Sequence, residues 1–176
     1  MSRIRITGGE WRSRLIDVAD APGLRPTPDR VRETLFNWLG QDLTGLACLD
    51  LFAGSGILGF EAASRGAAHV TLVEQDRRVF TQLQRNADFL KMPRLELVCG
   101  DALKFSPARC YDLILLDPPY RQGWLDKVAP VLQGWVAPGA RIYAEAEHAI
   151  ESIGAWRVVK QGRAGQVFFH LLEQAQ

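Results

Sequence analysis

"ACLDLFAGSGILG", residues 47–59, contains the pattern that decides the fold. Its first half is a short apolar run typical of a buried strand, and the glycines Gly54, Gly56 and Gly59 follow directly. Glycine permits a sharp turn and lets a ligand approach the backbone closely. The stretch therefore predicts a strand over 47–52, a glycine-rich loop and a helix over 57–66 whose first N–H groups are free to bind a ligand.

Strand-like and helix-like segments alternate after this stretch. Apolar runs typical of strands cover 69–74, 95–99, 111–117 and 140–147, and helical patterns cover 76–90 and 124–133. This alternation predicts an α/β fold, a Rossmann-like, mostly parallel sheet with helices on both faces. Residues 156–161 and 165–173 are joined by a short glycine-containing link, so we expect an antiparallel C-terminal strand pair at the sheet edge.

The N-terminal residues have a different pattern. Residues 3–7 alternate in polarity, Gly8-Gly9 can form a tight turn and residues 10–18 can return, which predicts a β-hairpin. We expect a basic hairpin and helix extension over residues 1–45 and a larger domain over 46–176, in one compact unit.

A loop and a helix follow this hairpin. Residues 19–26 are rich in helix breakers, and Thr27 is a candidate N-cap for a helix with Pro28 at its first position. A second interpretation of Thr27 is equally open, namely that it lies in a loop that folds over a bound cofactor.

The composition is that of an ordinary globular protein, with 47% hydrophobic and 23% charged residues. No stretch approaches 18 apolar residues and the first residues lack the apolar segment of a signal peptide, so we expect a cytoplasmic protein that does not enter membranes. The cysteines Cys48, Cys99 and Cys110 form no CxxC pair. We expect buried free thiols, with neither a metal site nor a disulfide.

Charge is unevenly distributed along the chain. Residues 1–32 contain seven arginines and four acids, a balance of +3, whereas the net charge of the whole chain is +1. A basic segment on a near-neutral body is consistent with a polyanionic partner and equally with a solvated surface.

Polar residues follow three successive predicted strands. Glu74 ends the strand after the glycine-rich loop, 20 residues beyond Gly54, and a carboxylate there can accept hydrogen bonds from both hydroxyls of a ribose. Asp101, followed by Ala102, comes after the next strand and can meet an adenine amino group. Together these residues predict an adenosine site at the carboxyl edge of the sheet, which suits either NAD or S-adenosylmethionine.

The next strand distinguishes these two cofactors, because it ends in Asp117-Pro118-Pro119-Tyr120. The Asp117 carboxylate and the Pro118 carbonyl can accept hydrogen bonds from the two N–H groups of a planar amino group and direct its lone pair toward a methyl carbon. Two prolines restrict the backbone, and Tyr120 offers a ring on which an unstacked base can lie. A hydride-transfer enzyme has no evident use for this arrangement, which favours an amino-methyltransferase.

The motifs DLFAGSG, LVEQD, GDA and DPPY, in this order, resemble those of class I amino-methyltransferases. With GGEWRSR, GLRPTPDRVRETLFNWL and GQVFF, nearly the whole chain resembles the RsmD family of 16S rRNA guanine-N2 methyltransferases. The resemblance implies S-adenosylmethionine as cofactor, S-adenosylhomocysteine as product, no metal, and catalysis by Asp117, Pro118, Pro119 and Tyr120. The implied cofactor-binding residues are Asp50, Gly54, Ser55, Gly56, Glu74, Asp101, Ala102 and Thr27.

The expected partner is small-subunit rRNA, either naked or within an assembling ribosomal particle, bound by a monomer. Candidate contacts are the arginines of the N-terminal segment and the one that follows DPPY: Arg3, Arg5, Arg12, Arg14, Arg25, Arg30, Arg32 and Arg121. Trp11 either stacks on a base or anchors the hairpin to the body of the protein.

Three alternatives remain open from the sequence. DPPY chemistry also serves adenine N6, so a DNA or RNA adenine-N6 methyltransferase is one alternative. A nicotinamide-dependent oxidoreductase and a noncatalytic nucleotide-binding module are the others.

Overall fold

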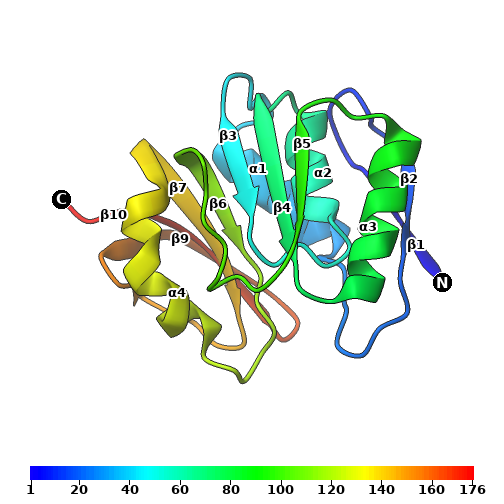
Figure 1. Ribbon diagram of the computed structural model, residues 1–176. Coiled ribbons are helices and arrows are strands. Elements are labelled where there is room, and N and C mark those ends of the chain that lie inside the picture. Colours follow the sequence, from blue (N-terminus) through cyan, green and yellow to red (C-terminus); the bar gives the residue numbers. More distant parts are fainter.

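The computed structural model describes residues 1–176, which form one α/β unit with helices on both faces of a sheet (Figure 1). In chain order the elements are β1 (Ser2–Arg5), β2 (Leu15–Val18), α1 (Asp29–Leu39), β3 (Ala47–Asp50), α2 (Ile57–Ser64), β4 (His69–Glu74), α3 (Arg77–Leu90), β5 (Leu95–Cys99), β6 (Tyr111–Leu116), α4 (Trp124–Leu132), the 3-10 helix η1 (Gln133–Trp135), β7 (Val136–Ala146), β8 (Ser152–Ile153), β9 (Trp156–Ala164) and β10 (Val167–Gln174).

The main sheet has eight strands in the order β5-β4-β3-β6-β7-β10-β9-β8. The first five are parallel, whereas β10 pairs antiparallel with both β7 and β9. The predicted α/β class with a mostly parallel sheet and an antiparallel C-terminal pair is confirmed. The final strand lies inside the sheet between β7 and β9, and the two-residue strand β8 was not predicted.

Helices cover both faces of this sheet, and a hydrophobic core lies on each side. On one face α1, α2 and α3 bury a large cluster that includes Leu35, Phe60 and Leu83. On the other face α4 and η1 bury Val128 and Trp135 against β6 and β7. Figure 1 shows α4 in front of the sheet and α1 and α2 behind it. Because the parallel strands are covered on both faces, they are nearly continuous apolar runs.

None of the helices is both long and apolar enough to cross a lipid bilayer.

The N-terminal hairpin is confirmed as a separate antiparallel sheet of β1 and β2, but its predicted tight turn at Gly8-Gly9 is wrong. Each strand has only four residues, and the connection runs from Ile6 to Arg14. Gly9 has φ +79°, and a Cβ atom there would lie 2.0 Å from the Ser64 carbonyl oxygen. Glycine is needed at this position because the chain passes closely over the end of α2.

The hairpin tip and the DPPY motif lie at opposite edges of the sheet. Glu10 donates from its backbone N–H to the Ser64 carbonyl, and the Trp11 indole donates to the Leu90 carbonyl, at the C-terminal ends of α2 and α3. Both helices begin at the carboxyl edge of the sheet, so their C-terminal ends lie at the other edge. The 14-residue helix α3 spans about 21 Å between these edges.

Two local predictions are corrected by the structure. Helix α1 begins at Asp29 with Pro28 as its N-cap residue, and the Thr27 side chain makes no capping hydrogen bond. Cys99 and Cys110 are exposed rather than buried, because Cys99 ends the edge strand β5 and Cys110 lies in the turn before β6. Cys48 is buried, and this burial raises the pKa of its thiol to about 12.

Candidate active site

The glycine-rich loop and Glu74 meet at the carboxyl edge of the sheet. The Gly54 N–H donates to Glu74 Oε1 at 2.9 Å, and the Asp76 N–H donates to Glu74 Oε2 at 2.8 Å. Gly56 has φ +85°, and a Cβ atom there would lie 2.3 Å from Leu83. Each carboxylate oxygen of the half-buried Glu74 retains a lone pair for a further donor.

Asp50, at the end of β3, is buried beneath this loop. Its Oδ2 atom accepts a hydrogen bond from the Gly59 N–H at 3.1 Å, whereas its Oδ1 atom has no partner. Burial, and then the nearby Asp117 carboxylate, raise the pKa of Asp50 to about 8. The buried acceptor without a partner marks a position that a donor from a bound ligand would satisfy.

Two further predicted cofactor residues lie at strand ends, and one lies in the loop. Asp101 follows β5, and its Oδ1 atom accepts from the Leu103 N–H at 2.8 Å, while Ala102 is buried in the core beside it. Ser55 is buried, and its hydroxyl accepts from the Ile57 N–H at the start of α2 at 3.3 Å. Ser55 therefore stabilises the loop conformation.

The DPPY motif leaves β6 at the same edge. Asp117 is half-buried, Pro118 is buried, and Pro119 and Tyr120 are exposed. Pro118, Pro119 and Tyr120 line a cavity of about 150 Å³ together with Trp124, Glu145 and Glu147. Three of the four predicted catalytic residues, Pro118, Pro119 and Tyr120, are thus next to a space that a ligand can enter.

Thr27 contacts Asp117 across a long stretch of sequence. The Thr27 hydroxyl donates to Asp117 Oδ2 at 3.5 Å, and Thr27 is only 4% exposed. Burial raises the pKa of Asp117, and hydrogen bonds from Glu145 and Thr27 oppose this rise. Thr27 therefore contacts Asp117, a predicted catalytic residue, and does not cap α1.

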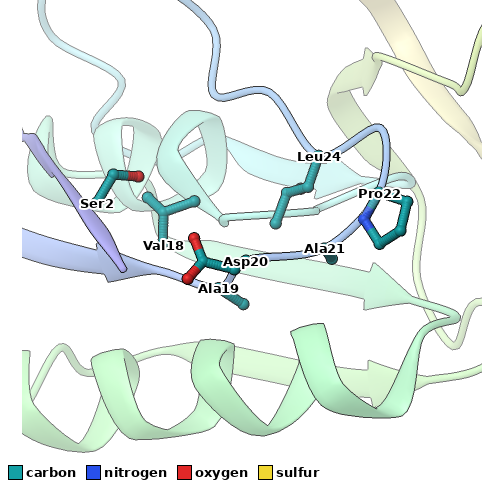
Figure 2. Close-up of a pocket in the computed structure, with 7 residues that line it drawn as sticks. All are labelled: Ser2, Val18, Ala19, Asp20, Ala21, Pro22 and Leu24. Atoms are coloured by element: carbon teal, nitrogen blue, oxygen red, sulfur yellow. The ribbon is translucent and has the colours of Figure 1, made fainter.

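The loop of residues 19–28, between β2 and α1, passes over the site. A side chain at Gly54 would lie 3.0 Å from Leu24, which places this loop directly above the glycine-rich loop. A cavity of about 390 Å³ lies beside it. Its lining includes Val18, Asp20, Pro22 and Leu24, which Figure 2 shows. None of the predicted site residues lines this cavity.

Arg32 does not contact a partner molecule, contrary to the prediction, because its side chain is wholly buried. It donates to Glu61 Oε2 at 2.9 Å and to the carbonyl of Arg5 at 2.8 Å, and it also donates to the carbonyl of Thr27. Arg32 therefore joins the hairpin, the 19–28 loop and α2. Arg30 and Arg32 are close in sequence, so both were predicted to be surface residues, but their side chains lie on different faces of α1.

The other predicted RNA-binding arginines remain exposed but form two separate groups. Arg25, Arg30 and Arg121 lie on segments at the carboxyl edge; Arg25 is close enough to Tyr120 to affect its pKa. Arg3, Arg5, Arg12 and Arg14 lie along the hairpin, which extends toward the opposite edge. The Trp11 indole anchors the hairpin through its 2.8 Å bond to Leu90, so the anchoring interpretation is confirmed.

Sequence reasoning missed three buried polar residues. Glu61 on α2 holds Arg32 and Arg65, and the pair Tyr143 and Glu145 on β7 lies beside Asp117. An acidic residue near the end of a central strand is a signal that could have identified Glu145, but its position beside Asp117 depends on strand register.

Comparison with known proteins agrees with this geometry. A family model described as "Conserved hypothetical protein 95" matches residues 4–173. The chain is 44% identical to ribosomal RNA small subunit methyltransferase D of Escherichia coli K12, over 98% of this chain and 90% of that protein. It is 39% identical to the protein of the same name from Haemophilus influenzae, over 97% of this chain and 93% of that one.

A solved structure supports the same relationship. The putative methyltransferase yhhF from Escherichia coli superimposes with a TM-score of 0.89 at 42% identity, covering 99% of both chains. By both sequence and structure, the chain belongs to the conserved hypothetical protein 95 family, the family of ribosomal RNA small subunit methyltransferase D.

Proposed function

We propose that this protein transfers a methyl group from S-adenosylmethionine to the exocyclic N2 amino group of a guanine in small-subunit rRNA. The observation that carries the proposal is the position of Asp117-Pro118-Pro119-Tyr120 at the same sheet edge as Gly54 and Glu74. Relatives that match nearly the whole chain bear the name of a small-subunit rRNA methyltransferase, which supports the substrate class.

The residues at the sheet edge fit an adenosyl cofactor. The lone pairs that remain on Glu74 suit ribose hydroxyls, and the free Oδ2 atom of Asp101 suits the amino group of adenine. The unpartnered Oδ1 atom of Asp50 suits a donor such as an ammonium group. When bound, S-adenosylmethionine supplies a methyl group activated by its sulfonium.

The DPPY residues would position the amino group for in-line attack. Asp117 and the Pro118 carbonyl accept hydrogen bonds from the two N–H groups of the guanine amino group. These hydrogen bonds turn the lone pair of the amino nitrogen away from the ring. Burial, and then neighbouring carboxylates, raise the pKa of Tyr120 to about 12, so its phenol stays neutral. Tyr120 therefore acts as a stacking surface, worth about 1–3 kcal/mol for a base. After transfer, Asp117 is placed to receive the proton that leaves the nitrogen.

The substrate guanine would come from an unpaired or easily opened region, because the base has to leave its stack to reach Asp117. Arg25, Arg30 and Arg121 would bind phosphates near that base, and the hairpin arginines would bind RNA farther away. We propose that the protein acts as a monomer in the cytoplasm, on small-subunit rRNA that is either free or within an assembling particle. We favour the particle because a domain of this size leaves little room for a module that reads RNA sequence.

The test is transfer of labelled methyl from S-adenosylmethionine to small-subunit rRNA and to small ribosomal particles from cells that lack the protein, followed by nucleoside analysis. We expect N2-methylguanine at one site, preferentially in particles. The Asp117→Ala variant should lose transfer while still binding S-adenosylhomocysteine. Methyl on adenine N6 would overturn the guanine assignment, and no transfer to nucleic acid would overturn the substrate class.

A further inference from the structure

Four polar side chains form a continuous hydrogen-bonded chain beside the DPPY motif. The Tyr143 hydroxyl donates to Glu145 Oε1 at 2.9 Å, and Glu145 is hydrogen bonded to the carboxyl group of Asp117. The Thr27 hydroxyl reaches the same Asp117 carboxyl group from the other side at 3.5 Å. The register of the parallel strands β6 and β7 pairs Leu116 with Ala144, so Asp117 and Glu145 are neighbours across the strands.

Asp117 is the most exposed member of this chain of side chains. Tyr143 is fully buried, and Glu145 and Thr27 are each 4% exposed, whereas Asp117 is half-buried. No lysine or arginine forms an ion pair with either carboxyl group. Two hydrogen-bonded carboxyl groups in such surroundings cannot both be ionised, so they share one proton.

The proton belongs to Glu145. Burial, and then the neighbouring Asp117, raise the pKa of Glu145 well above its usual range. The other ionisable groups that face it are the buried Asp50 on β3, Tyr143 on its own strand and Tyr120, none of which is a cation. Asp117 gains hydrogen bonds from Glu145 and Thr27 that favour its charged form.

We propose that Glu145 is a positioning residue: its neutral carboxylic acid donates a hydrogen bond to Asp117 and, together with Thr27, orients that carboxylate toward the amino group of the substrate. Tyr143 orients Glu145 by donating to its Oε1 atom, so every donor in the chain points toward Asp117. This inference rests on the proposed methyl transfer, but the protonation state of Glu145 is independent of it.

The decisive comparison is between Glu145→Gln and Glu145→Ala. Glutamine can donate to Asp117 and accept from Tyr143, as the neutral acid does, whereas alanine can do neither. We expect Glu145→Gln to keep most of the kcat of the wild-type protein and Glu145→Ala to lose about 10–100-fold, the value of a hydrogen bond to a charged group. The dissociation constant of S-adenosylhomocysteine should change little in both variants, which also shows that they are folded.

The pH profile separates orientation from simple support of the fold. Wild-type activity should fall at alkaline pH as Glu145 ionises, since a donor is lost and a second negative charge appears beside Asp117. The Glu145→Gln variant should lack this fall. If Glu145→Gln is as impaired as Glu145→Ala, or if Glu145→Ala is as active as the wild type, the inference is overturned.

A spectroscopic measurement tests the same inference without turnover. The infrared difference spectrum between the wild type and Glu145→Gln at neutral pH should contain the carbonyl stretch of a protonated carboxylic acid. Its absence would overturn the inference even if methyl transfer is observed. Its presence with no methyl transfer by the wild type would instead count against the proposed function.

Discussion

Arg32 places its Nε atom 2.9 Å from the Oε2 atom of Glu61, and neither side chain is exposed to solvent. Other N–H groups of the same guanidinium bind backbone carbonyls of Arg5 and Thr27. Glu61 also accepts from the Thr7 N–H at 2.9 Å and from Arg65 at 2.7 Å. Through this one ion pair, the hairpin, the loop that carries Thr27 and helix α2 are joined.

The Arg32–Glu61 ion pair should be important for stability. Removing one partner of a buried ion pair typically costs about 3–5 kcal/mol when the other charge is left uncompensated. Glu61 keeps Arg65 as a partner at 2.7 Å, so we expect Arg32→Met to lower the free energy of unfolding by up to about 3 kcal/mol in urea denaturation. Arg30→Met, on the exposed part of the same helix, is the control and should change it by less than about 0.5 kcal/mol. Equal effects of the two changes would show that burial of Arg32 is not the cause.

Glu74 should determine cofactor affinity. Both of its oxygens already bind backbone N–H groups that shape the glycine-rich loop, and we expect ribose hydroxyls to use the remaining lone pairs. Glu74→Ala should raise the dissociation constant of S-adenosylhomocysteine about 10–100-fold in calorimetry. The exposed Glu96, on the neighbouring strand β5, provides the control, and Glu96→Ala binding as weakly as Glu74→Ala would refute the assignment.

Asp50 should make the protein less stable as the pH rises. Its pKa is raised to about 8 in the folded protein, whereas an unfolded aspartate has a pKa near 4. The folded state therefore binds the proton more tightly, and the stability from this proton is full below about pH 4 and lost as the pH approaches 8. Asp50→Asn does not titrate, so it should flatten this dependence and be more stable at about pH 8 by a few kcal/mol. Unfolding curves of the wild type and Asp50→Asn at about pH 5 and about pH 8 give the change in the free energy of unfolding with pH. If both proteins lose the same stability between these pH values, Asp50 is not the cause.

The exposed arginines should control how RNA binding depends on salt. If Arg25 and Arg121 each bind one phosphate, Arg→Ala at either position should reduce the slope of log affinity against log salt by about one. Arg12→Ala should do the same only if the bound RNA extends to the hairpin tip. Arg157→Ala, on the exposed surface of β9, should leave the slope unchanged. If none of these changes alters the slope, electrostatic binding of RNA by Arg25, Arg121 and Arg12 is ruled out.

The sequence was sufficient to predict the sheet and to place the candidate site residues at one edge of it, because the signals for both are local. Apolar runs of strand length, a glycine-rich loop and acidic residues directly after strands identify Gly54, Glu74 and Asp117 without knowledge of the fold. Helix α3 also agrees with the predicted helix over 76–90, because it has Asp76 as its N-cap and ends at Leu90.

Partners that are distant in sequence could not be predicted in this way. Thr27 and Asp117 are separated by 90 positions, and Glu145 meets Asp117 only through the register of two strands. The sequence around Arg32 is typical of a solvent-exposed arginine. Only the tertiary structure, in which Arg32 pairs with Glu61 on α2, shows that its side chain is buried. Gly8-Gly9 suggested a turn because close packing against Ser64 leaves no trace in the local sequence.

The position of the hairpin against α2 and α3 also constrains the order in which the chain can fold during synthesis. Its anchoring hydrogen bonds join residues 53 to 79 positions apart, from Trp11 to Ser64 and Leu90. The apolar residues Ile6 and Ile16 are fully or almost fully buried in the finished protein, but the helices that bury them are synthesised later. Because the hairpin is synthesised before α3, its apolar surface stays exposed until α3 has emerged.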